Sequence, residues 1–68
     1  MLVAALSVTE IEVLRALWDG KKVAEIAKER FVCDKTIESQ RRNLFLKAGV
    51  TSLATLFRWG LKKGYIQP

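Results

Sequence analysis

Apolar residues recur at helical spacing in four stretches of the chain, and short polar or glycine-containing stretches separate them. The first helix is expected to begin at Ser7, because Ser7 and Glu10 have the spacing of a capping box, in which each side chain satisfies an open backbone N–H group. Gly20 can supply the left-handed turn that ends this helix. Four apolar residues share one face between these ends: Ile11, Leu14, Leu17 and Trp18.

A second, shorter helix is predicted over residues 23–29, where Val23, Ile26 and Ala27 form a narrow apolar stripe. Lys22 precedes this helix, and Ser or Thr would be a better N-cap at that position. We therefore expect the second helix to start without a good cap.

The third helix is predicted to run from about Asp34 to Lys47, with Gly49 as its stop. Its inner face carries apolar residues at helical spacing: Ile37, Leu44 and Ala48. Its opposite face is polar over more than one turn before it reaches a large apolar residue: Lys35, Glu38, Ser39, Arg42 and then Leu46. This helix therefore presents a polar surface away from the core.

The fourth helix is predicted to open at Ser52 and to end at Gly64. Its apolar side is formed by Leu53, Leu56, Phe57, Gly60 and Leu61. Tyr65 and Ile66 are then expected to fold back onto the core. Together the four stretches predict an all-α fold, a four-helix bundle containing a helix-turn-helix.

The helix-turn-helix is expected in the stretch from Glu25 to Arg42, where two short helices are joined by a tight connection. One of these helices packs against the core, while the other offers a polar face. A DNA-binding helix-turn-helix needs this layout, because the second helix has to enter a groove of the duplex.

Sixty-eight residues allow one small domain, which we place at residues 7–68 after a linker or N-terminal extension at residues 1–6. The net charge of +5 is uneven along the chain. Residues 1–33 hold equal numbers of acidic and basic side chains, whereas residues 34–68 hold seven basic side chains against Asp34 and Glu38. This asymmetry indicates a polyanionic partner, nucleic acid or an anionic membrane surface, or else a solvated basic surface.

Composition argues against several other functions. A single cysteine and no histidine give no internal disulfide and no structural zinc site, and nothing in the sequence calls for a cofactor or metal. The opening MLVAAL is too short for a signal-peptide core or a membrane span, which predicts a cytoplasmic chain without a membrane partner. No nucleophile–base pair or glycine-rich phosphate loop is present, so we expect no enzyme activity.

The segments LSVTEIEVLRAL, Gly20 and VAEIAKERFVCDKTIESQRRNLFLKAGV together resemble the LuxR/FixJ (NarL-type) helix-turn-helix domain of bacterial transcription factors. The resemblance covers about residues 6–64. Within the family, the run TIESQRR is most similar to the Rcs-type response-regulator branch, because Gln40 stands where most members have His. Region 4 of a sigma factor shares the fold but fits the EIEVLRAL start and the KAGV turn less well.

The resemblance implies a C-terminal effector domain of a bacterial transcriptional regulator that binds specific sequences of double-stranded DNA, with the third helix (about 34–47) in the major groove. It also implies a homodimer on DNA, for which the candidate contacts are Trp59 and Arg58, and RNA polymerase as a further candidate partner. A tryptophan at the edge of such an apolar stripe, like Trp59, belongs to the core more often than to a dimer contact. Position by position, the base-facing residues are Glu38, Ser39 and Arg42, and the phosphate-contacting residues are Lys35, Thr36 and Arg41.

Besides Gln40, four residues depart from the family pattern. Glu38 can accept a hydrogen bond from cytosine, or it can pair with Arg42 four residues on. Arg30 stands where a buried leucine is usual and is expected to keep its charged head in water. Cys33 replaces a Ser or Thr cap, either as a tolerated small, half-buried residue or as a reactive thiol at a helix N-terminus. Leu46 replaces a basic residue.

The departures leave a second function open. A helix-turn-helix can also serve as a protein-interaction module, an adaptor or antagonist of a related regulator. The uncapped second helix, Glu38 and Leu46 favour that alternative. Salt separates the two, because phosphate contacts make the affinity for DNA fall steeply as salt is added.

Overall fold

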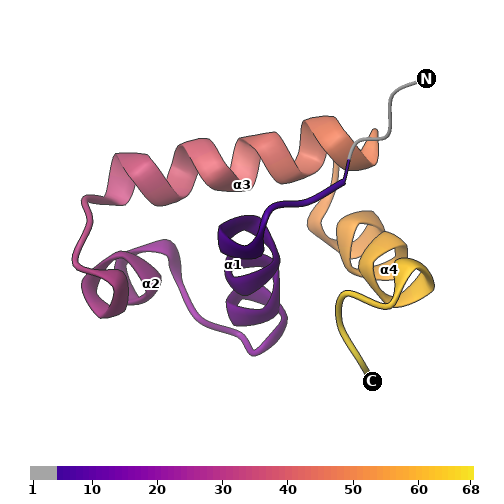
Figure 1. Ribbon diagram of the computed structural model, residues 1–68, viewed down its shortest axis with the longest axis horizontal. Helices are drawn as coiled ribbons and strands as arrows, with labels where there is room; N and C mark the ends of the chain where they lie inside the picture. Colours follow the sequence, from indigo (N-terminus) through magenta and orange to yellow (C-terminus); the bar gives the residue numbers. More distant parts are fainter. Residues whose placement is uncertain (1–4) are drawn as a thin grey trace.

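The computed structural model describes residues 5–68, which form four helices and no strand: α1 (Val8–Trp18), α2 (Val23–Arg30), α3 (Asp34–Ala48) and α4 (Leu53–Lys63). In Figure 1, α3 runs along one side of the molecule, and α1 lies between α2 and α4 beneath it. The other three helices all pack against α3. The predicted all-α fold with a helix-turn-helix, here α2 and α3, is confirmed. No helix among residues 5–68 combines the length and apolar character needed to cross a bilayer.

The predicted caps define most helix ends. The Ser7 hydroxyl accepts from the Glu10 N–H at 3.2 Å, and the Glu10 carboxylate accepts from the Ser7 N–H at 2.9 Å. At α4, the Ser52 hydroxyl accepts from the Thr55 N–H at 3.3 Å. Gly49 ends α3 with φ +70°, a left-handed backbone that glycine adopts without steric cost. The third helix therefore ends at Ala48, one residue beyond the predicted Lys47, and Gly49 is its stop as predicted.

The start of α2 confirms that Lys22 is a poor N-cap and adds a contact that was not expected from the sequence. The Lys22 side chain makes no capping bond, but the Glu25 carboxylate reaches back and accepts from the Lys22 backbone N–H at 2.9 Å. Glutamate at the third helical position supplies this half of a capping box whatever residue precedes the helix. One argument for an interaction module, an uncapped second helix, is thereby removed.

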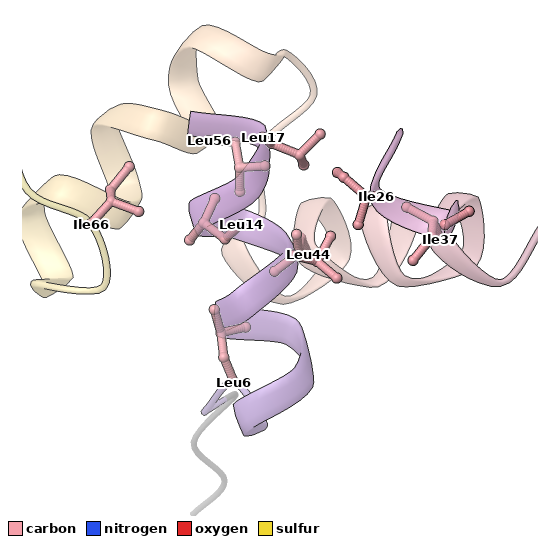
Figure 2. Packing of buried hydrophobic residues seen from close by; sticks show 10 residues of the cluster. Leu6, Leu14, Leu17, Ile26, Ile37, Leu44, Leu56 and Ile66 are labelled. Atoms are coloured by element: carbon pink, nitrogen blue, oxygen red, sulfur yellow. The ribbon is translucent and has the colours of Figure 1, made fainter. Parts of the chain in front are cut away.

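One hydrophobic core joins all four helices (Figure 2). Its largest fully buried side chains come from every helix: Val13, Leu14, Ile26, Ile37, Leu44 and Leu56. Leu6 is also in this core, although residues 1–6 were predicted to be an extension. Residues 1–4 of that extension lie outside the described part of the chain.

The C-terminal tail folds back onto α1, as predicted. Ile66 is buried, and the backbone oxygens of Tyr65 and Gln67 accept hydrogen bonds from Arg15 (3.0 Å) and Trp18 (2.8 Å). Gly60 permits this packing, because a Cβ atom there would lie 3.1 Å from Ile66 and from Leu14. The tail thus completes the core on the side away from α3.

An ion pair fixes α3 against the start of α1. The Lys47 ammonium donates to the buried Glu10 carboxylate at 2.7 Å, and the same carboxylate oxygen caps α1. Burial by itself would raise the pKa of Glu10, but the hydrogen bonds from Lys47 and from the Ser7 N–H outweigh it and hold that pKa below its usual value. The charged carboxylate therefore links both helices.

Candidate nucleic-acid interface

The buried residues of α3 determine which of its residues face outward. Ile37 and Leu44 are fully buried, so the rotation of the helix about its axis is fixed. The residues on the opposite side are consequently exposed: Lys35, Glu38, Ser39 and Arg42. We call these four residues the α3 stripe. The structure brings the three predicted base-facing residues together on it, with Lys35 at its N-terminal end.

The side chains of the α3 stripe have no partners within the protein. Among residues 5–68, no side-chain hydrogen bond or ion pair involves any of the four. The pairing of Glu38 with Arg42 that their spacing allowed is therefore not formed. Both charges are available to an outside partner.

The N-terminus of α3 differs from the expectation in one respect. Cys33 is the N-cap, and its thiol makes no capping bond, as expected, but the residue is exposed rather than half-buried. Its sulfur lies 3.4 Å from the hydroxyl of Thr36, and this hydrogen bond lowers the pKa of Cys33 below its usual value. Thr36 is thus half-buried and turned toward Cys33, while Lys35 points to solvent.

Arg41 lies on the flank of α3 rather than on the stripe. It is half-buried, and its guanidinium lies over the ring of Phe45, 5.0 Å from the ring centre. This cation–π contact holds the head group on the flank of the helix, beside the α3 stripe. The structure therefore separates Arg41 from Lys35, its predicted companion at phosphate.

The two candidate dimer residues on α4 lie in different environments. Trp59 is half-buried and packs against the core, with its ring centre 5.4 Å from that of Tyr65. Arg58 is exposed. Trp59 therefore fits the core-edge alternative, and Arg58 remains free for a contact.

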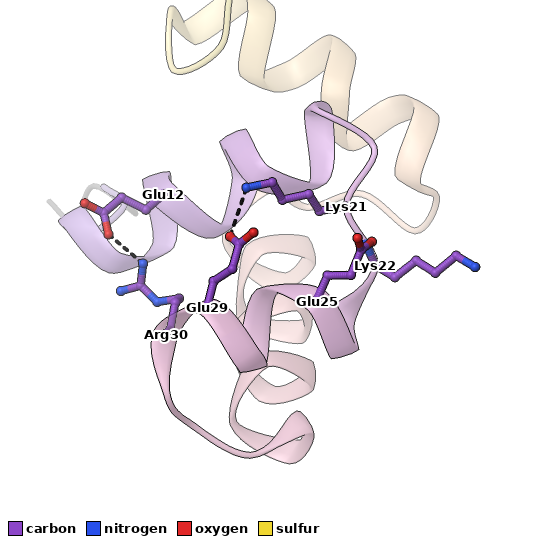
Figure 3. A network of polar contacts seen from close by, with 6 residues as sticks. All are labelled: Glu12, Lys21, Lys22, Glu25, Glu29 and Arg30. Carbon is purple, nitrogen blue, oxygen red and sulfur yellow. Dashed lines mark hydrogen bonds and ion pairs between the residues drawn. The ribbon is translucent and has the colours of Figure 1, made fainter.

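The surface between α1 and α2 carries two ion pairs that the sequence did not indicate (Figure 3). The Arg30 guanidinium donates to Glu12 at 2.7 Å, and the Lys21 ammonium donates to Glu29 at 2.9 Å. Arg30 is half-buried with its head group at the surface, as predicted for a snorkelling side chain. Its partner could not be predicted, because Glu12 is 18 residues away on another helix.

The connection between α2 and α3 contains the most exposed large apolar side chain of residues 5–68. Phe31 ends α2 in the left-handed conformation, with φ 58° and ψ 41°, and it is 95% exposed. Sequence reasoning missed it, because no glycine marks this turn. Leu46, at the far end of the outer side of α3, is 72% exposed.

A four-helix bundle in which α2 braces an exposed polar helix is a helix-turn-helix domain of the kind that binds DNA. The family model described as bacterial regulatory proteins, luxR family, matches residues 4–59. The chain therefore belongs to the LuxR family, whose helix-turn-helix domains generally bind DNA in transcription regulators. The match gives no support to the Rcs-type branch in particular. Neither the curated proteins nor the solved structures gave a match.

Proposed function

We propose that this domain binds specific sequences of double-stranded DNA as the C-terminal effector domain of a bacterial transcriptional regulator, with α3 in the major groove. The observation that carries the proposal is the α3 stripe, four exposed polar residues without internal partners on a helix fixed by its buried face. A surface of this kind loses no internal bond when it binds DNA.

Each residue of the stripe has a chemical role toward base edges or phosphate. Arg42 can donate two hydrogen bonds to the edge of guanine. Glu38 is not paired with Arg42 and can accept a hydrogen bond from the amino group of cytosine. At sites without a cytosine in reach, its negative charge is only repelled by the DNA phosphates. Ser39 can donate or accept, so it adds contact with little discrimination. Arg42 and Glu38 together therefore favour a G·C-containing site.

The phosphate contacts lie at the start of α3 and beside it. Lys35 is exposed in the first turn, where the helix dipole and open backbone N–H groups also favour an anion. Thr36 reaches phosphate by turning its hydroxyl away from the Cys33 sulfur, because its backbone N–H already donates to the Cys33 oxygen at 3.0 Å. Arg41 contacts phosphate from the flank while its guanidinium stays on Phe45.

Two copies bind half-sites about one helical turn apart, and α4 contributes Arg58, with Trp59 at the edge of the contact. The chain has no acidic residue after Glu38, so α4 carries Arg58, Lys62 and Lys63 without compensation. Two such faces repel each other in solution. We therefore propose that the homodimer forms on DNA and not in free solution. On the resemblance alone, we also propose that the domain is part of an Rcs-like response regulator and acts in the bacterial cytoplasm. RNA polymerase is its further proposed partner.

The proposal is tested by selecting bound duplexes from a random-oligonucleotide pool with the 68-residue chain. Enrichment of a repeated, G·C-containing half-site is the expected result. A pool that stays random after several rounds, with no duplex binding above background at low salt, would refute sequence-specific binding.

Leu46 supports a second candidate, a helix-turn-helix used to bind another protein. It is 72% exposed on the outer side of α3, where a basic residue would serve DNA better. Affinity for a protein through such an apolar residue would change little with salt, whereas affinity for DNA falls steeply. A salt titration of the complex therefore separates the two candidates.

A further inference from the structure

Phe31 adopts a backbone conformation that suits glycine. With φ 58° and ψ 41° it is the one non-glycine residue of positive φ among residues 5–68. The left-handed conformation brings the Cβ atom close to the following carbonyl oxygen, which is unfavourable for most residues other than glycine. Such strained positions cluster at functional sites.

The turn explains the conformation but not the residue. The Phe31 N–H donates to the Lys28 oxygen at 3.3 Å, and the Val32 N–H donates to the Ala27 oxygen at 3.0 Å. These bonds form a Schellman motif, which closes α2 abruptly and lets α3 begin at Asp34. The motif requires a left-handed residue at position 31, and Gly or Asn would meet that requirement at lower cost.

The phenyl ring gains nothing inside the fold. It is 95% exposed, so almost none of its apolar surface is removed from water. An aromatic ring in that state contributes no stability to offset the backbone strain. The fold itself therefore gives no reason for an aromatic residue at this position.

The surroundings of Phe31 indicate what that partner is. Lys28 lies one turn earlier on α2, and Lys35 lies in the first turn of α3. Both are exposed, and neither has an ion-pair partner among residues 5–68. Asp34 opposes them with a single negative charge, so the local balance is positive. An exposed apolar ring that is flanked along the chain by two free cations matches a DNA strand, in which phosphates alternate with apolar deoxyribose faces.

We propose that Phe31 packs against a deoxyribose of the strand beside α3, while Lys28 and Lys35 contact the neighbouring phosphates. This assignment rests on the proposed DNA-binding function. Phe31 thus acts as a positioning residue, since its contact with one sugar sets the position of the start of α3 along the strand. Because every nucleotide has the same sugar, its contribution does not depend on base sequence.

Three substitutions at Phe31 test the assignment. Phe31→Gly and Phe31→Asn remove the ring and tolerate the left-handed turn, whereas Phe31→Tyr keeps the ring. Affinity is measured by fluorescence anisotropy on a labelled duplex of random sequence at several salt concentrations, beside thermal melts. Val8→Ala is the matched control, because Val8 is an exposed apolar residue (72%) on α1.

Phe31→Gly and Phe31→Asn are expected to bind about five- to tenfold more weakly, as for partial burial of an aromatic side chain. The salt slope stays unchanged, because no phosphate contact is removed. The melting temperature of Phe31→Gly is expected to be no lower than that of the parent chain. Phe31→Tyr and Val8→Ala are expected to bind DNA with the affinity of the parent chain. If Phe31 had only a structural role, the Gly and Asn variants would show the reverse result, a lower stability with unchanged DNA affinity.

If the parent chain binds the duplex and the Gly and Asn variants bind equally well, the sugar contact is refuted while the proposed function stands. This is also the result expected if Phe31 docks onto a protein instead. If the parent chain binds no duplex even at low salt, the sugar contact and the proposed function both fail.

Discussion

Four charged side chains on the surface between α1 and α2 form ion pairs, whereas those on the α3 stripe are free. Arg30 and Lys21 are held by Glu12 and Glu29, and these pairs tie α2 to α1 and to the α1–α2 connection. Lys35, Glu38 and Arg42 have no such partners among residues 5–68. The difference separates two uses of charge, because a paired charge braces the fold while a free charge can bind an outside partner.

The distinction has an energetic basis. An exposed ion pair contributes about 0–1 kcal/mol, and breaking it to bind something else costs a similar amount. A solvated cation needs no such exchange, and it releases counterions when it meets a polyanion. The free charges of α3 are therefore the ones whose removal should change DNA affinity, and the paired charges are the ones whose removal should change stability.

The largest expected effect is at the most buried pair, Glu10 with Lys47. Glu10→Gln removes the charge that holds Lys47 and weakens the cap of α1, so we expect a loss of about 2–3 kcal/mol in the free energy of unfolding. Thermal or urea melts at neutral pH measure it. An unchanged melting curve would show that this pair does not brace the fold.

Glu10 also predicts how stability depends on pH. Its pKa is lower in the folded protein than in the unfolded chain. Its contribution to stability is therefore complete above the unfolded-state pKa and is lost as pH falls through the folded-state pKa. Melts between neutral pH and about pH 3 should show this loss in the parent chain, and a much weaker one in Glu10→Gln.

Arg42→Ala should lower DNA affinity and leave the stability of the fold almost unchanged. We expect specific DNA binding to weaken by about 1–3 kcal/mol, because a contact to a base edge is lost, while the unfolding free energy changes by less than about 0.5 kcal/mol. Lys22→Ala is the control, since it removes the same charge from an exposed position before α2, where the side chain makes no capping bond or ion pair. A mobility-shift titration in which both variants bind like the parent would exclude Arg42 from the interface.

Glu38→Gln should give a smaller effect of the opposite sign. Removing a free carboxylate from the α3 stripe lowers repulsion from phosphate, so affinity for random-sequence DNA should rise by about two- to fivefold, and preference for the selected site should fall. If Glu38 were paired with Arg42, a double-mutant cycle on stability would show coupling between the two residues. We expect that coupling to be near zero.

The features that sequence reasoning predicted correctly have local causes. Ser7 with Glu10, and Gly49 at its stop, are signals that act within one turn of the chain. The pairing of Arg30 with Glu12 joins two helices, and no local pattern encodes which charges meet. Glu38 and Arg42 illustrate the converse, because spacing permits their pairing but side-chain rotamers decide it. Phe31 escaped notice because its conformation follows from the turn rather than from its own residue type.

The smallest expected effect is at the exposed pair of Arg30 with Glu12, and it tests the comparison most directly. Glu12→Gln makes the same chemical change as Glu38→Gln, but at a paired carboxylate. We expect a loss of about 0.2–1 kcal/mol in the free energy of unfolding, and random-sequence DNA affinity equal to that of the parent. If Glu12→Gln strengthened DNA binding as much as Glu38→Gln, net charge alone would control affinity. The separation of bracing charges from binding charges would then be wrong.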